Sequence, residues 1–199
     1  MLTELKRPAT LSSEKSKVFW GEIAPPDHLL QIYENDAEFL AALGKFVADG
    51  FRKNESVIVI GTAWHLNALE KQLSAFDTDV LRARNQYIPL DAEETLSKFM
   101  VEGWPNQQLF ERCVTDVLRR ASQNGRGVRA FGEMVALLWA QENHAATIQL
   151  EILWHQFQKK NAFSLFCAYP KNGFRENSLA GVQKICDAHS KMVPGSFAI

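Results

Sequence analysis

Side chains that could hold a small molecule follow the predicted strands of this chain, where each strand passes into a helix. They combine aromatic, thioether, imidazole, hydroxyl and carboxylate groups. Such a mixture suits a small, partly apolar ligand fixed by a few polar contacts. The candidate ligand-binding residues are Tyr33, Glu34, Thr62, His65, Asp91, Glu133, Met134 and Tyr169.

Three of these side chains are expected to line one shared pocket. In open α/β sheets the ligand crevice lies beyond the carboxyl ends of the parallel strands. Tyr33, His65 and Glu133 come from three different strand-to-helix junctions, which a parallel sheet brings to one edge. We expect Glu133 to be the polar anchor and His65 a neutral hydrogen-bonding partner. Tyr33 and Met134 would form apolar walls.

A structural role is the alternative for each of these residues. Thr62 and Asp91 stand where helix N-caps are found. His65 lies in a first helical turn, where the helix dipole disfavours imidazolium, and it could contact a ligand or brace a neighbouring loop. Glu133 follows an apolar strand and a glycine, so a ligand contact and a capping role both stay open. Tyr33 could be a core residue whose hydroxyl is satisfied by backbone.

Apolar strands that alternate with amphipathic helices must position these side chains. Strands are expected at residues 29–33, 56–61, 87–90, 128–132 and 163–169. Helices are expected at 36–49, 62–77, 91–100, 106–124, 133–139, 143–160 and 178–191. This alternation predicts an α/β fold with a mostly parallel sheet and helices on both faces.

The turn between the first strand and its helix carries the chemistry opposite to that of a phosphate loop. Nucleotide-binding α/β proteins place their phosphate loop at such a turn. Here it contains Glu34, Asp36 and Glu38, no glycine, and no Lys-Ser/Thr pair. Three carboxylates repel a triphosphate, and nothing in the turn would hold phosphate and magnesium. The sequence therefore favours a sensor over an ATPase.

Composition narrows the function classes. The chain has 199 residues, 46% of them hydrophobic and 23% charged, with a net charge of −1. It lacks the basic stripe of a nucleic-acid binder, an apolar run of membrane-spanning length and the apolar region of a secretory signal. Its three cysteines are widely spaced in apolar surroundings, which indicates reduced core residues of a cytoplasmic protein. We expect a polar leader at 1–27 and a single domain at 28–199.

Other constellations predict neither catalysis nor a metal site. His144 and His155 share a helix face without an accompanying His-Glu-x-x-His pattern. Cys186 and His189 are three residues apart, but no second ligand pair is visible. A Gly-x-Ser-x-Gly nucleophile turn is absent from the sequence. We therefore expect no catalytic residue, no metal and no cofactor.

Several short motifs together resemble a known family, the MEDS domain, or methanogen/methylotroph DcmR sensory domain. The resemblance runs from about His28 to Pro194. The motifs that carry it are His28…Tyr33-Glu34, Gly61-Thr62…His65, Asp91-Ala92, Phe99-Met100…Gly103…Pro105, Phe131-Gly-Glu-Met-Val135…Leu138-Trp139, Leu150-Glu151…Leu153-Trp154, Cys167-Ala-Tyr-Pro170 and Ile185-Cys186…His189-Ser190.

The resemblance implies a RecA/KaiC-like core without the phosphate loop. It also implies a sensor of small hydrocarbon derivatives that works beside DNA-binding domains or in histidine-kinase signalling proteins. This chain departs from the family pattern in two ways. We expect no attached output domain, and His155 stands where an Asn is expected after Leu-Trp.

Three function classes follow. The favoured one is a non-enzymatic sensory domain that binds a small ligand and signals through a histidine kinase or transcriptional regulator. The alternative is a protein-interaction module with a closed, vestigial nucleotide cleft. An enzyme that uses Glu133 and His65 as an acid–base pair is disfavoured, because no nucleophile, metal set or cofactor motif supports it. Direct contact with nucleic acid or membrane is not expected, and the oligomeric state stays open.

Overall fold

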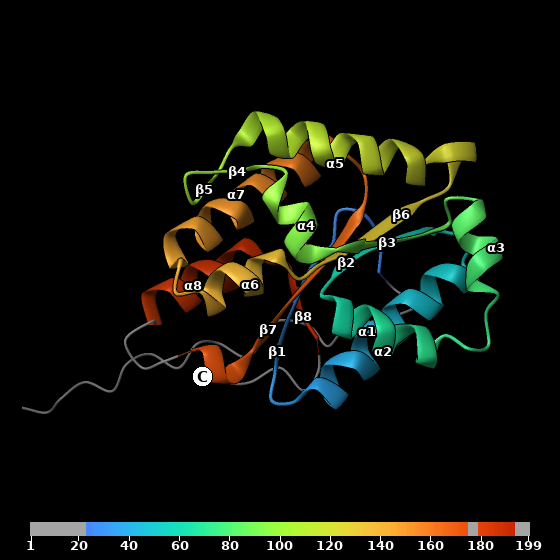
Figure 1. The fold of residues 1–199 in the computed structure, drawn as a ribbon, viewed down its shortest axis with the longest axis horizontal. Coiled ribbons are helices and arrows are strands. Elements are labelled where there is room, and N and C mark those ends of the chain that lie inside the picture. The colour runs from blue at the N-terminus through green and yellow to red at the C-terminus, as the bar shows by residue number, and fades with distance from the viewer. Residues whose placement is uncertain (1–22, 175–178, 194–199) are drawn as a thin grey trace, which may run out of the picture.

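A six-stranded sheet forms the centre of the protein in a computed structural model that describes residues 23–174 and 179–193 (Figure 1). The strand order is β3-β2-β6-β7-β1-β8, and every pair of neighbours is parallel. The strands of this sheet are β1 (His28–Tyr33), β2 (Ser56–Gly61), β3 (Tyr87–Asp91), β6 (Val128–Gly132), β7 (Ser164–Pro170) and β8 (Lys191–Met192). The α/β architecture with a parallel sheet is confirmed.

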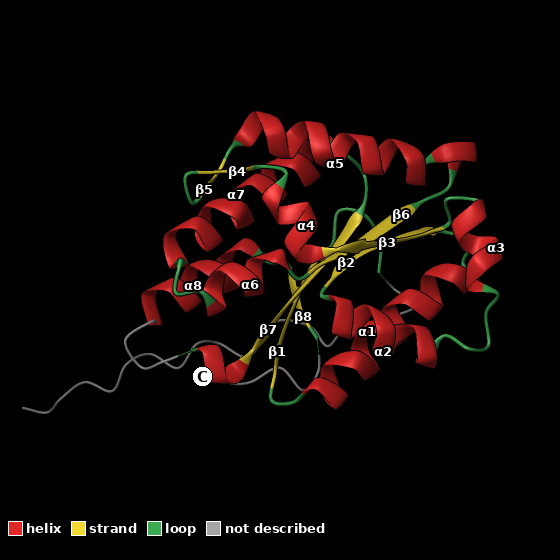
Figure 2. Cartoon of the chain, in the orientation of Figure 1, coloured by secondary structure: helices red, strands yellow, loops and turns green. Residues whose placement is uncertain are grey.

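Helices cover both faces of the sheet, as the alternating pattern predicted (Figure 2). One face carries α1 (Asp36–Arg52), α2 (Ala63–Gln72) and α3 (Thr78–Ala83). The other face carries α4 (Ala92–Ser97), α5 (Gln107–Ala121), α6 (Met134–Ala140), α7 (His144–Lys160) and α8 (Leu179–Ala188). Short 3₁₀ turns follow at Gln123–Gly125 and Lys171–Gly173.

Alternation along the buried strands divides the core into two halves. On β1, Leu30 and Ile32 belong to the core under α4–α8, whereas Leu29 and Tyr33 belong to the core under α1–α3. Side chains of successive strand residues point to opposite faces. Two strand-end residues can therefore share an edge of the sheet and still lie on different faces.

Two expected helices differ from the structure in ways that change the course of the chain. The helix expected at 62–77 is two helices, because α2 ends at Gln72 and Asp77 caps α3. The helix expected to run through Met100 stops at Ser97, and Met100–Val101 (β4) pairs antiparallel with Trp104–Pro105 (β5). Gly103 has a φ of 78°, a conformation that suits glycine at this tight turn.

The C-terminal element ends earlier than expected. Helix α8 stops at Ala188, and β8 then pairs with the edge of β1, so the helix expected to reach Lys191 was too long. Ser178, its expected start, lies outside the described residues. Of the expected leader, residues 23–27 are described, and Ile23 is buried against the core. Within the described ranges, no helix is long and apolar enough to cross a membrane.

Candidate functional site

Glu133 joins two strand ends at the carboxyl edge of the sheet. It follows β6 directly and is only 6% exposed. Its carboxylate does not cap its own helix, α6. Instead, Oε2 accepts a hydrogen bond of 2.8 Å from the backbone N–H of Thr62, just after β2. The capping role considered for Glu133 is thus not what holds it, and its carboxylate stabilises the neighbouring β2–α2 turn.

His65 lies beside Glu133 and Thr62. These three residues, together with Tyr33, are called the carboxyl-edge group. Its Nδ1 lies 2.6 Å from Oε1 of Glu133 and 2.9 Å from Oγ1 of Thr62. Nδ1 thus faces two oxygen atoms, and an N–H at this position can donate to the Glu133 carboxylate. The other ring nitrogen, Nε2, is buried and makes no hydrogen bond with the described residues. Nε2 lies 3.8 Å from Oδ1 of Asp36.

Aromatic rings fill the space beside this pair. Tyr33 stacks on Phe39 with ring centroids 4.8 Å apart, and Phe39 meets His65 edge-on at 4.7 Å. Burial raises the pKa of the Tyr33 hydroxyl well above its ordinary value, and the carboxylates of Glu133 and Asp36 raise it further. Tyr33, Thr62, His65 and Glu133 therefore converge at one edge, in a group that is packed with side chains.

The other four predicted residues make different contacts. Glu34 is exposed and forms an ion pair of 2.7 Å with Lys171. Asp91 caps α4 by accepting a hydrogen bond from the Glu94 N–H. Met134 is fully buried in the core under α4–α8. The hydroxyl of Tyr169 donates a hydrogen bond of 2.5 Å to Glu151, on that same face of the sheet.

We predict that Glu133→Gln lowers thermal stability by several degrees. The amide would keep one of the two hydrogen bonds and would place an N–H₂ group against the other donor. Leaving a buried donor unsatisfied costs about 1–3 kcal/mol, and each kcal/mol lowers Tm by about 2–4 °C at this chain length. Calorimetry would measure the melting temperatures of Glu133→Gln and of Glu93→Gln, which is the control because Glu93 is exposed. Equal melting temperatures for both variants would show that Glu133 does not brace this turn.

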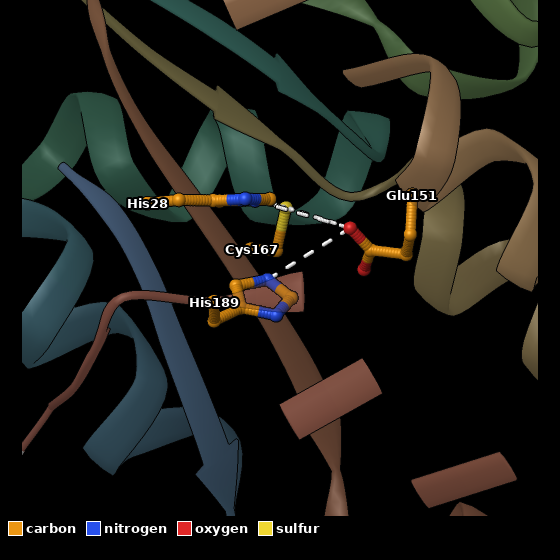
Figure 3. Close-up of side chains that lie close together, drawn as sticks. All are labelled: His28, Glu151, Cys167 and His189. Carbon is orange, nitrogen blue, oxygen red and sulfur yellow. Dashed lines mark hydrogen bonds and ion pairs between the residues drawn. The ribbon is translucent and has the colours of Figure 1, made fainter. Parts of the chain in front are cut away.

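A second polar group, which sequence reasoning missed, is buried between the sheet and α7 (Figure 3). It consists of His28 at the start of β1, Glu151 on α7, Cys167 on β7 and His189 after α8. All four are buried, and their nearest ligating atoms lie within 4.8 Å of one another. No metal set was expected from the sequence, yet these residue types are those that bind metals.

Burial sets the protonation of this His-Glu-Cys group. It lowers the pKa of His28 well below the ordinary histidine value, and His189 adds to the effect. Burial also raises the pKa of Glu151 to about 7, against the hydrogen bond from Tyr169, which lowers it. The pKa of the Cys167 thiol is raised well above its ordinary value by burial and by Glu151.

A cavity of about 600 Å³ opens at the amino edge of the sheet, opposite the carboxyl-edge group. It lies beside the start of β1, the end of α7 and the segment between α8 and β8. Its wall includes Pro25, Pro26, His28, His155, Ala188 and His189. None of the eight residues predicted to bind a ligand lines it. Two residues of the buried His-Glu-Cys group, His28 and His189, line this cavity.

The fold is an α/β domain with an all-parallel central sheet, and the turn after its first strand is acidic and contains no glycine. Comparison of the sequence with models of protein families identifies the family. The family model described as MEDS, the MEthanogen/methylotroph, DcmR Sensory domain, matches residues 27–185. The chain therefore belongs to the MEDS family of sensory domains. No curated protein matches the chain significantly.

Proposed function

We propose that this protein is a non-enzymatic sensory domain that binds a small, partly apolar ligand and passes the signal to a partner protein. Membership of a sensory family supports the general role. The observation that carries the ligand-binding part is the cavity of about 600 Å³ at the amino edge, a volume in the range of small-molecule sites.

The chemistry of the cavity wall matches such a ligand. Pro25, Pro26 and Ala188 supply apolar surface, while His28 and His155 supply imidazole nitrogens. Burial lowers the pKa of both histidines, which favours neutral rings that can donate or accept a hydrogen bond. A hydrocarbon bearing one or two polar substituents fits these contacts. The partner proposed for the signal is a histidine kinase or a transcriptional regulator.

The carboxyl-edge group is the second candidate for ligand contact. In its favour, Nε2 of His65 is buried and lacks a hydrogen bond within the described residues. Thr62, His65, Glu133 and Tyr33 would then contact the ligand. The same geometry also supports the alternative function, a protein-interaction module with a closed cleft. Tyr33, Phe39 and His65 occupy the edge where a nucleotide would bind in a RecA-like domain.

We expect Ala162→Trp to weaken ligand binding at least tenfold, or about 1.4 kcal/mol. Ala162 is an exposed residue on the cavity wall, so a tryptophan there would occupy space that the ligand needs. Ala145→Trp is the matched control, because Ala145 is exposed on α7 and does not line the cavity. Ligand-observed NMR with short alcohols, methylamines and halogenated methanes would measure binding to the wild type and to both variants.

Each outcome decides between locations or functions. Suppose that Ala162→Trp leaves ligand binding intact and Glu133→Gln weakens it. The ligand site would then lie at the carboxyl edge and not in the cavity. If no compound in the panel binds, native mass spectrometry of protein purified from its own host provides a second measurement. A chain without a bound small molecule in both experiments would overturn the sensor proposal and favour the protein-interaction module.

A further inference from the structure

The four buried residues around Glu151 come from segments far apart in the sequence, yet their side chains point at one centre (Figure 3). Nε2 of His28 lies 3.5 Å from Sγ of Cys167 and 3.8 Å from Oε2 of Glu151. Oε2 of Glu151 also lies 3.8 Å from Nε2 of His189 and 4.0 Å from Sγ of Cys167. Two nitrogens, one sulfur and one oxygen thus surround a common point.

These separations are close to those of a tetrahedral metal site. Zinc binds at about 2.0–2.1 Å from nitrogen or oxygen and about 2.3 Å from sulfur, which places neighbouring ligand atoms roughly 3.3–3.6 Å apart. The four distances between 3.5 and 4.0 Å need to shorten by a few tenths of an ångström. The widest separation in the group, 4.8 Å, needs a larger movement of the side chains toward the ion.

Outer contacts already orient two of the ligands. Nδ1 of His189 lies 2.6 Å from the backbone carbonyl oxygen of Ile185, so it carries the donated proton and Nε2 faces the centre with its lone pair. Oε1 of Glu151 accepts the hydrogen bond from Tyr169, which leaves Oε2 for the centre. Such second contacts are typical of histidine and carboxylate metal ligands.

The backbone around His28 is fixed as well. Its N–H donates to Oγ of Ser190 at 2.9 Å, and the Ser190 N–H donates to its carbonyl at 2.8 Å. The start of β1 and the residue that follows His189 are therefore held together before any metal enters. The arrangement is built by several elements and does not depend on one flexible side chain.

We propose that His28, Glu151, Cys167 and His189 form a zinc-binding centre. Two neutral imidazoles, a thiolate and a carboxylate carry a total charge of −2, which a divalent zinc ion neutralises in this buried place. Nitrogen and sulfur donors disfavour calcium and magnesium, which take oxygen ligands. Four protein ligands close the coordination sphere, as in structural zinc sites.

The cavity at the amino edge adjoins this centre. His28 and His189 belong both to the cavity wall and to the ligand set. Bound zinc would connect β1, β7, α7 and the segment before β8. It would also fix one wall of the cavity. The zinc proposal does not depend on the cavity holding an organic ligand.

The test uses the full chain without an affinity tag, reduced and stripped of metal by a chelator. Zinc titration followed by metal analysis should give about one zinc per chain. Cobalt should give the visible bands of a tetrahedral site together with a near-ultraviolet band from a cobalt–thiolate bond. Cys167→Ser should abolish the thiolate band. The same substitution should weaken zinc binding by at least as much as the loss of an outer hydrogen bond does, which is about 10- to 100-fold.

Two controls separate this centre from other residues of the same type. Cys113→Ser removes a half-buried thiol on α5, and His155→Gln removes a cavity histidine that is not a ligand. Both variants should keep the zinc stoichiometry and the cobalt spectrum. If Cys167→Ser fails to fold, the wild-type cobalt spectrum decides. Wild type without stoichiometric zinc, or without a thiolate band, would overturn the proposal, as would a folded Cys167→Ser with unchanged affinity.

Discussion

Replacing Arg129 by methionine should lower the free energy of unfolding by about 3–5 kcal/mol, the cost typical of breaking a buried ion pair from one side. Arg129 is 1% exposed on β6. Its guanidinium pairs with Asp49 at 3.1 Å and with Glu55, and it donates to the Phe46 carbonyl at 3.0 Å. Methionine fills similar space but leaves both carboxylates without this partner.

Chemical denaturation of Arg129→Met beside Arg119→Met would measure this loss. Arg119 is 77% exposed and pairs with Asp116 on the same helix. An exposed pair of this kind contributes about 0–1 kcal/mol. Similar losses for the two variants would show that the interactions around Arg129 contribute little to stability.

Arg129 is also connected to the carboxyl-edge group through strands β2 and β6. It ties the end of α1 and the residue before β2 to β6, and the far ends of β2 and β6 carry Thr62 and Glu133. A loss of order around Arg129 would therefore loosen the register that places the Glu133 carboxylate against the Thr62 N–H. We expect Arg129→Met to change the structure at both ends of these two strands.

The central strands could be predicted from the sequence because each is a buried apolar run. Ser56–Gly61 and Val128–Gly132 have the predicted bounds, since nearly every residue in them enters the core. The strands β4, β5 and β8 have two residues each, too few for any periodicity to show. They form because pairing partners are near: β5 for β4, and the edge of β1 for β8.

Only strand-end side chains on one face of the sheet meet in the carboxyl-edge group. Tyr33, His65 and Glu133 converge because parallel strands end at one edge. Met134 and Tyr169 also follow strands, but they lie in the core under α4–α8. Strand order and side-chain direction together decide which strand-end residues meet, and a single sequence does not specify the order.

The His-Glu-Cys group carries no local motif. Residues 28, 151, 167 and 189 meet only because β1 and β7 are neighbours and α7 crosses the same face. One signal was present in the sequence. Glu151 stands among Leu150, Leu153 and Trp154 on an otherwise apolar helix face, and a carboxylate in that position needs a buried partner.

Zinc should raise the melting temperature of the metal-stripped wild type by about 5–15 °C. A ligand that binds only the folded state stabilises it by about 2.7 kcal/mol at 100 times its Kd and about 4.1 kcal/mol at 1,000 times. Each kcal/mol raises Tm by about 2–4 °C at this chain length. The ligands come from four separate segments, so the unfolded chain does not present them together.

Calorimetry with and without zinc, and again after a chelator is added, would measure the shift. The zinc-dependent rise in melting temperature should be small for Cys167→Ser, whereas Cys113→Ser should show the same rise as the wild type. Tyr169→Phe is the informative intermediate, because it keeps every ligand and removes only the hydrogen bond to Oε1 of Glu151. Its shift should fall between the two, since loss of an outer contact weakens metal binding by about 10- to 100-fold. A shift of the same size in wild type and Cys167→Ser would place the stabilising zinc elsewhere on the protein.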